Sequence, residues 1–365
     1  MNPVVEAFRG LAALMVLVHH YSYRIDGIIP DGQGHFFHNG VDLFFVITGF
    51  LFAPYLLGEA KQPLIAFVIR RAFRLYPLYF LSLIVAVTYF FEEKAGLLEA
   101  IVKHLFFIQA LPANTLSEVG FLSLVYWTLP VEVMFYVIVV IVMAIDRHNN
   151  VSLIWRSRLI YSGVFSWILF IISYYLNFDP SSESWVLWQA QLPALLPAFW
   201  LGLVIHCSRN FVSNHRYTRY MSLLVGSVLL FILFPIYPDF ARSSLTARPF
   251  GWFNIASAIA YAFLLSGILG LYDQAILHKK NRSFLHEVLI RLALTFGSLS
   301  YGIYLFHEWA LVIVEHSMKT LSTGFQILLS IAITIILAQI LHTLVELPFR
   351  TYGRKLAYSR PDKVD

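Results

Sequence analysis

The sequence is poor in cysteine and in charged residues. One cysteine, Cys207, occurs among 365 residues, which excludes an intramolecular disulfide and a cysteine-rich metal site. Asp, Glu, Lys and Arg make up 13% of the chain, about half the share that is usual in soluble domains, while hydrophobic residues make up 59%. The chain therefore has too few polar side chains to cover a soluble globule of its length.

The net charge gives no sign of a nucleic-acid partner. It is only +5, and the basic residues form short clusters between apolar segments rather than one basic face. This arrangement is typical of the loops of integral membrane proteins. We therefore expect the protein to lie in membrane lipid and not to bind nucleic acid.

Ten apolar segments are each close to the ~20 residues that a helix needs to cross a bilayer. We predict membrane spans at Val4–Tyr23, Asn39–Gly58, Leu75–Phe91, Leu124–Ile145, Leu159–Leu176, Val186–His206, Tyr220–Tyr237, Phe250–Tyr272, Leu292–Ser317 and Phe325–Leu347. A shorter segment, Leu97–Leu111, contains Glu99, Lys103 and His104, which is typical of an interfacial or re-entrant helix. The predicted fold is an all-α bundle of about ten transmembrane helices.

The distribution of basic residues predicts how these spans are oriented. With ten spans, 20 of the 26 Lys and Arg residues fall on one side of the membrane and six on the other. The side that is rich in basic residues is normally the cytosol, so both termini should be cytosolic. An additional span at Leu97–Leu111 would move every later cluster across the membrane and abolish this bias. We expect residues 1–350 to form the membrane domain and residues 351–365 a short polar cytosolic tail.

An ionisable side chain inside a span is costly, so each one is a candidate functional residue. Arg9 and His20 lie eleven positions apart in the first span, which places them on one helix face, within about 20° and roughly 16 Å apart. His19 points well away from Arg9. A pair of histidines at the outer membrane boundary is the plainer alternative.

Three more ionisable residues reach a similar depth from other spans. Asp42, Glu132 and His307 can occupy one layer with His20 if their helices are neighbours. A histidine beside carboxylates in a dehydrated site suits proton abstraction near neutral pH. The alternative is a buried polar network that only fixes the packing of the helices.

A second group of charged residues lies toward the cytosolic ends of the spans. Arg71 and Arg74 are three residues apart on one helix face and could bind phosphates, and Arg350 follows Glu346 late in the chain. Arginines in such a position often do no more than set the membrane topology. We prefer that interpretation for Arg70.

Six short motifs, in order along nearly the whole chain, resemble those of the membrane-bound acyltransferase 3 family. They are Arg9 with His20, Gly40–Leu51, Arg71–Pro77, Trp127–Tyr136, Ser300–His307 and Glu346–Arg350. Val133 departs from the family pattern, since many relatives carry a second acid there, and Pro130 replaces a small residue. We expect a stand-alone member, without the esterase-like domain that some relatives append.

The resemblance implies an enzyme that moves an acyl group, most often acetyl from acetyl-CoA, to a hydroxyl of a carbohydrate or lipid-linked glycan. It implies catalytic roles for His20, Asp42, Glu132 and His307. Acyl-CoA binding would then fall to Arg9, Arg71, Arg74 and Arg350, with support from Tyr301, Tyr304 and Glu346. We expect no metal and no permanently bound cofactor. By the same resemblance, the location would be the bacterial inner membrane.

These residues suggest a mechanism in which the CoA phosphates bind Arg71 and Arg74 and the thioester extends along the Arg9 face. His20 would deprotonate the acceptor hydroxyl, and a covalent acyl-histidine intermediate is an open alternative. A transporter or flippase for an envelope precursor is the main competing function, because it would also line its pathway with buried charges. A purely structural or regulatory membrane protein is the third.

Overall fold

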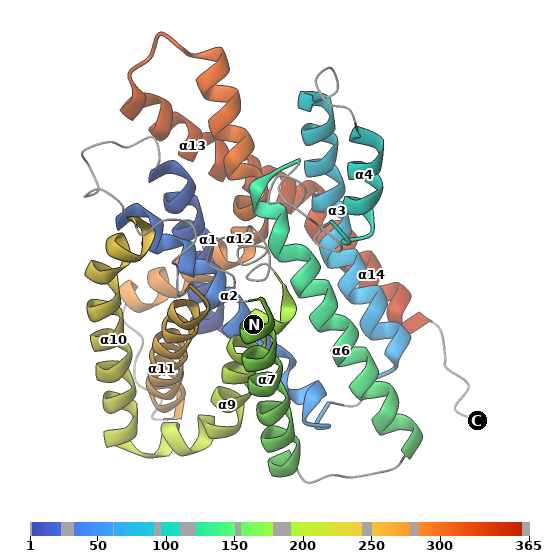
Figure 1. Cartoon of the computed structure of the whole chain (residues 1–365), viewed down its shortest axis with the longest axis vertical. Coiled ribbons are helices and arrows are strands. Elements are labelled where there is room, and N and C mark those ends of the chain that lie inside the picture. The colour runs from blue at the N-terminus through green and yellow to red at the C-terminus, as the bar shows by residue number, and fades with distance from the viewer. Residues whose placement is uncertain are drawn as a thin grey trace. The chain divides into compact units, whose positions relative to one another are not determined.

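The computed structural model describes residues 2–22, 33–60, 62–90, 96–109, 122–149, 155–177, 191–242, 250–277 and 284–359. These residues form helices and no strands (Figure 1). The chain divides into two compact units, and each unit combines two separate stretches of sequence. Unit 1 comprises Met1–Ala53 and Leu159–Ser300, and unit 2 comprises Pro54–Arg158 and Tyr301–Asp365.

Unit 1 contains the first helices of the chain and most of its central part. Its elements are α1 (Pro3–Ser22), η1 (Gln33–Asn39), most of α2 (Gly40–Leu56), most of α7 (Trp155–Asn177), α9 (Leu192–Asn214), α10 (Arg216–Arg242), α11 (Phe250–Leu277) and the first half of α12 (Phe284–Ser317). Helices α9, α10 and α11 pack against one another, and η1 packs against α1.

Unit 2 contains the remaining elements. These are α3 (Leu64–Phe90), α4 (Leu97–Leu105), η2 (Leu124–Trp127), α6 (Thr128–Asn149), the second half of α12, α13 (Thr323–Leu341), the π-helix η3 (His342–Glu346) and α14 (Leu347–Ser359). Helix α14 lies along α3 (Figure 1).

The prediction of about ten membrane spans is confirmed. Ten helices in the described part of the chain are long and apolar enough to cross a membrane, the last running through α13, η3 and α14. Several helices begin or end elsewhere than predicted. Helix α3 begins at Leu64 rather than Leu75, and α12 begins at Phe284 rather than Leu292. The basic residues that we assigned to the loop before the third span, apart from Lys61, therefore lie within α3.

Helix α4 is not among the candidate spans, as the sequence indicated. It is nine residues long and packs on α3. Two α3 tyrosines hold its C-terminal end, because Tyr79 donates a hydrogen bond to the carbonyl of His104 (3.0 Å) and Tyr76 donates one to that of Leu105 (3.1 Å).

Burial of His104 makes the docking of α4 sensitive to pH. The side chain is fully buried, its Nδ1 donates to the Ala100 carbonyl (2.7 Å), and burial lowers its pKa from 6.5 to about 4. The undocked helix would take up a proton between pH 6.5 and 4 while the folded one would not, so stability is lost as the pH falls through this range. The loss should reach about 3 kcal/mol near pH 4. Thermal unfolding midpoints from pH 4 to 7 should show this slope in the wild type and a flatter curve in His104→Gln; equal slopes would contradict it.

In unit 1, helices α2 and α9 cross with their backbones in contact. A Cβ added at Gly49 would stand 1.9 Å from the Phe199 carbonyl oxygen, and one at Gly202 would stand 2.3 Å from the backbone nitrogen of Phe50. Small residues permit such close approach of membrane helices. We expect the crossing to tolerate no side chain on either glycine.

We predict that Gly202→Ala destabilises the protein by roughly 1–3 kcal/mol, because the new methyl group meets backbone atoms that cannot rotate away. The thermal unfolding midpoint in detergent should fall accordingly. Gly324→Ala is the matched control, since nothing lies within 4 Å of a Cβ at that position. A wild-type midpoint for Gly202→Ala would show that the two helices are not in this contact.

Candidate active site

The Arg9 guanidinium is buried in α1 and is neutralised by a carboxylate of the same helix. Its Nη1 lies 3.2 Å from Oε2 of Glu6, one turn earlier, and both residues are more than nine-tenths buried. The two side chains lie where α1 meets α12, because a Cβ on Gly297 would come within 2.4 Å of the Glu6 Cβ. Glu6 was missed in the sequence, although its spacing of three residues from Arg9 was a readable signal.

His20 lies near the other end of the same continuous helix. Its Nδ1 is 3.0 Å from the carbonyl oxygen of Val16. A carbonyl only accepts hydrogen bonds, so Nδ1 carries the proton and Nε2 carries the lone pair. The His19 ring packs between His20 and His38, with ring centroids 5.0 Å and 5.1 Å away. In its neutral form the half-buried His20 imidazole thus presents its basic nitrogen at Nε2.

Asp42 lies in the first turn of α2 and is 2% exposed. Its Oδ2 has no hydrogen-bond partner within the described ranges. A helix N-terminus favours negative charge, which offsets part of the cost of burying a carboxylate there. Arg9, His20 and Asp42 thus belong to unit 1, as the sequence placed them on the first two spans.

Glu132 belongs to unit 2 and is joined to the arginines there. It accepts a hydrogen bond from the Tyr136 hydroxyl, one turn later in α6. The guanidinium carbon of Arg71 lies 6.0 Å from the centroid of the Tyr136 ring and 5.6 Å from that of Phe67. Tyr136 therefore connects Glu132 to Arg71. That Glu132 shares a layer with His20 stays a prediction, and the link through Tyr136 was not among the sequence predictions.

His307 is fully buried in α12 and is held in the same way as His20. Its Nδ1 lies 3.0 Å from the Ile303 carbonyl, which again leaves the lone pair on Nε2. Its ring centroid is 6.4 Å from that of Tyr304. Structure and sequence agree that this histidine lies inside the bundle, among the helices of unit 2.

The two tyrosines of the late motif bind backbone carbonyls of unit 2. Tyr304 donates to the carbonyl of Val125 in η2 (2.7 Å), and Thr128 shares the same hydroxyl (2.7 Å). Tyr301 donates to the Leu75 carbonyl in α3 (3.0 Å). Their hydroxyls thus join α12 to η2 and α3, so the two tyrosines suit the role of fixing the position of α12.

Glu346 and Arg350 form a charged group at η3. Oε1 of Glu346 accepts from Nη1 of Arg350 (3.1 Å), and Oε2 accepts from Nδ1 of His342 (2.9 Å). The carboxylate is 3% exposed, so this pairing satisfies a charge that would be costly alone. The guanidinium of Arg350 is therefore shared with Glu346, and His342 is a partner that the sequence reading missed.

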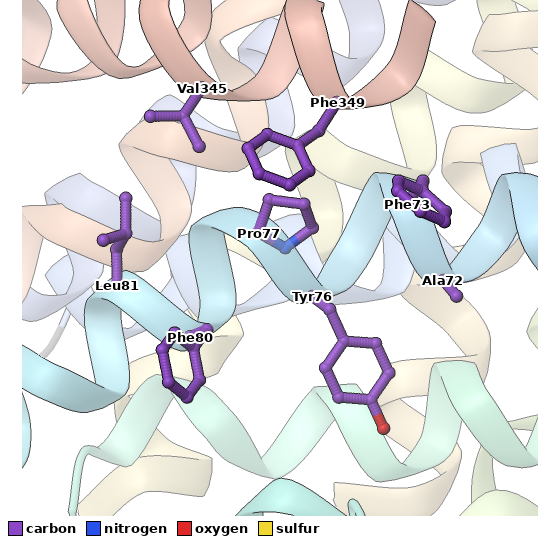
Figure 2. A pocket seen from close by; sticks show the side chains of 8 residues that line it. All are labelled: Ala72, Phe73, Tyr76, Pro77, Phe80, Leu81, Val345 and Phe349. Atoms are coloured by element: carbon purple, nitrogen blue, oxygen red, sulfur yellow. The ribbon is translucent and has the colours of Figure 1, made fainter. Parts of the chain in front are cut away.

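An apolar groove of about 550 Å³ lies between α3 and the helices that follow α13. Figure 2 shows the Phe349 ring of α14 facing Pro77 of α3. The other lining residues are Ala72, Phe73, Tyr76, Phe80, Leu81 and Val345. Such a lining suits hydrocarbon: it offers no carboxylate or imidazole, and the Tyr76 hydroxyl is bonded to the Leu105 carbonyl.

Comparison with known proteins identifies the protein family. A family model described as an acyltransferase domain matches residues 2–343. Proteins from Staphylococcus aureus strains COL and MSSA476, each named "Putative O-acetyltransferase", are 25% identical over 393 residues, covering 99% of this chain and 59% of theirs. A protein of that name from strain MRSA252 is 25% identical over 384 residues, or 97% and 58%. The chain thus spans under two thirds of the length of these relatives. No solved structure matches it.

Proposed function

The chain belongs to the acyltransferase 3 family, and from this premise we propose that it moves an acyl group from acyl-CoA to a hydroxyl of a carbohydrate or glycolipid. Acetyl from acetyl-CoA is the proposed donor group, and an envelope polysaccharide or its lipid-linked precursor is the proposed acceptor. We place the protein in the plasma membrane, the bacterial inner membrane, with both termini in the cytosol.

The tautomer of His20 carries this proposal. An acceptor hydroxyl is a poor nucleophile until a base removes its proton, and a neutral imidazole is the side chain best suited to do so near pH 7. The Nδ1 bond to Val16 fixes the ring with its basic nitrogen at Nε2. Asp42 is the proposed carboxylate that orients the reacting groups, together with Glu132.

The proposed reaction balances without any cofactor. His20 Nε2 accepts the hydroxyl proton while the hydroxyl oxygen attacks the thioester carbonyl, giving a tetrahedral intermediate. The carbon–sulfur bond then breaks, and the CoA thiolate takes the proton back from the imidazolium. The products are an ester and free CoA, and His20 returns to its neutral form. His307, buried with the same tautomer, is the second proposed catalytic imidazole.

Arg71 and Arg74 are the proposed ligands of the CoA phosphates. Both lie in the first half of α3, and Arg71 is supported by the faces of Phe67 and Tyr136. Arg9 and Arg350 remain proposed donor-binding residues. Because each is paired with a glutamate of its own helical segment, we expect them to orient the thioester arm rather than to neutralise phosphate.

Mass spectrometry of envelope glycans tests the function in the cell. Glycans from wild-type cells should carry an acyl substituent that is missing in cells without the gene and in cells producing His20→Ala. A transporter or flippase would give a different result, since its loss would remove the whole glycan from the cell surface. An unchanged acyl pattern in the gene-deleted cells would overturn the proposal.

A further inference from the structure

A group of buried polar side chains lies in unit 1 beside Asp42. Asn39, Asn254 and Ser257 are 1%, 7% and 0% exposed, and Asp42 is 2% exposed. Both amide atoms of Asn39, Oδ1 of Asn254, Oγ of Ser257 and Oδ2 of Asp42 have no hydrogen-bond partner among the residues that the structure describes. Buried polar groups are normally paired, so several unpaired ones in one unit mark a candidate site for a polar ligand.

Two contacts show that the segment from η1 into α2 packs beside α11 where these residues lie. At one end, the rings of Phe36 in η1 and Phe253 in α11 lie 6.5 Å apart. At the other end, Met15 of α1 lies beside α11 and the start of α2: the Tyr261 hydroxyl lies 3.9 Å from its sulfur, and a Cβ on Gly40 would stand 2.9 Å from its Cβ.

Asn39 in η1 and Asn254 and Ser257 in α11 fall between these two contacts, and Asp42 follows in the first turn of α2. Asn39 directly precedes Gly40 and lies one turn before Asp42. Asn254 follows Phe253, and Ser257 lies one turn before Tyr261 on the same face of α11. The side chains therefore share one buried region of unit 1.

This region lies next to α1 at the level of the His20 ring. The chain of η1 and α2 runs antiparallel to α1, since a Cβ on Gly34 would meet Ser22 and one on Gly40 would meet the Ala12 carbonyl. Asn39 thus lies near the level of Val16, the residue whose carbonyl binds His20. A ligand held by Asn39 would reach the height at which His20 presents its base.

The chemistry of the unpaired atoms indicates the class of ligand. Oδ1 of Asn39 and Oδ1 of Asn254 only accept hydrogen bonds and Nδ2 of Asn39 donates, whereas the Ser257 hydroxyl does both and the Asp42 carboxyl accepts when ionised and can donate when protonated. The set contains both acceptors and donors, so the ligand must bring groups of both kinds. A molecule with several hydroxyl groups meets this requirement, because each hydroxyl both donates and accepts.

We propose that Asn39, Asn254 and Ser257 form, together with Asp42, the subsite that binds the hydroxyl-bearing acceptor. This inference rests on the proposed function and adds to it the residues that select the acceptor. The buried cluster of Phe36 and Phe253, packed with Phe234, borders the subsite at one end. Neither Asn39 nor the two α11 residues stood out in the sequence.

Sugar binding without any donor tests the subsite. The probes are methyl β-D-glucopyranoside and methyl N-acetyl-β-D-glucosaminide, added to the full chain in lipid nanodiscs. A ligand that binds only the folded protein raises its unfolding midpoint. We expect at least one sugar to raise the midpoint of the wild type, and the rise to be largely lost in Ser257→Ala and Asn39→Leu. Ser166→Ala is the control, because that buried hydroxyl is already bonded to the Ser162 carbonyl.

The midpoints without sugar separate this role from a structural one. Replacing an unpaired buried polar group by an apolar one should leave the midpoint unchanged or raise it, whereas loss of a structural network would lower it. In transfer assays, the two variants should raise the KM for the sugar at least tenfold and leave the KM for acetyl-CoA unchanged. Equal stabilisation of wild type and variants by sugar, or no stabilisation of the wild type by either sugar, would overturn the subsite. Consumption of acetyl-CoA by all of these proteins would meanwhile leave the proposed function standing.

Discussion

His20→Ala is expected to lower the rate of acyl transfer by at least about 10³-fold while the protein still inserts into the membrane and folds. A positioned general base contributes about 10²–10⁴-fold to the rate. The bond from Nδ1 to the Val16 carbonyl positions the His20 ring in α1 for this role. The measurement is the initial rate of CoA release by purified protein with a saturating acceptor. Added imidazole should restore part of the rate, because a small base can enter the space that the side chain leaves.

His215→Ala provides the matched control for this variant. His215 also bonds through Nδ1 to a carbonyl one turn earlier, that of Phe211 (2.8 Å), but it is exposed at the end of α9. Its replacement should leave the rate unchanged. Wild-type activity in His20→Ala, with a normal unfolding midpoint, would remove His20 from the mechanism.

Arg74→Gln is expected to raise the KM for acetyl-CoA by about 10–100-fold with a smaller effect on kcat. That range corresponds to about 1.4–2.8 kcal/mol, the size expected for charge-assisted bonds to a phosphate. The comparison donor is acetyl-pantetheine, which lacks the nucleotide phosphates. If Arg74 binds phosphate, the wild type should prefer acetyl-CoA strongly and the variant only weakly.

Arg70→Gln is the control for the phosphate-binding role. Arg70 lies one turn from Arg74, but its guanidinium binds Tyr358 and Tyr55, each at 3.3 Å, and Gln62. We expect its loss to affect stability more than the KM for acetyl-CoA. An equal preference for the two donors in wild type and Arg74→Gln would show that the phosphates bind elsewhere.

Hydropathy and charge bias were sufficient to predict the number of spans and the separate character of α4. They were not sufficient to predict where α3 begins, because Arg70, Arg71 and Arg74 lower the local hydropathy although they are helical. Their partners, such as Tyr136 on α6 and Tyr358 on α14, lie far away in the sequence. A hydropathy window along the chain therefore starts this helix eleven residues too late, at Leu75 rather than Leu64.

The site was predictable where its residues interact within one helix. Glu6 with Arg9, and Glu346 with His342 and Arg350, stand three or four residues apart and can be read from spacing alone. The link from Glu132 through Tyr136 to Arg71 depends on helix packing, as does the proposed subsite of Asn39, Asn254 and Ser257. No spacing rule within one helix reaches contacts of this kind.

The fate of the thioester tests the account most directly. Protein in lipid nanodiscs would receive acetyl-CoA labelled in the acetyl group, together with glycans extracted from the envelope of the host cell. We predict that free CoA and labelled glycan ester form in equal amounts with the wild type, and that neither forms with His20→Ala. Intact acetyl-CoA in the presence of wild-type protein and the complete glycan extract would contradict the proposed acyl transfer.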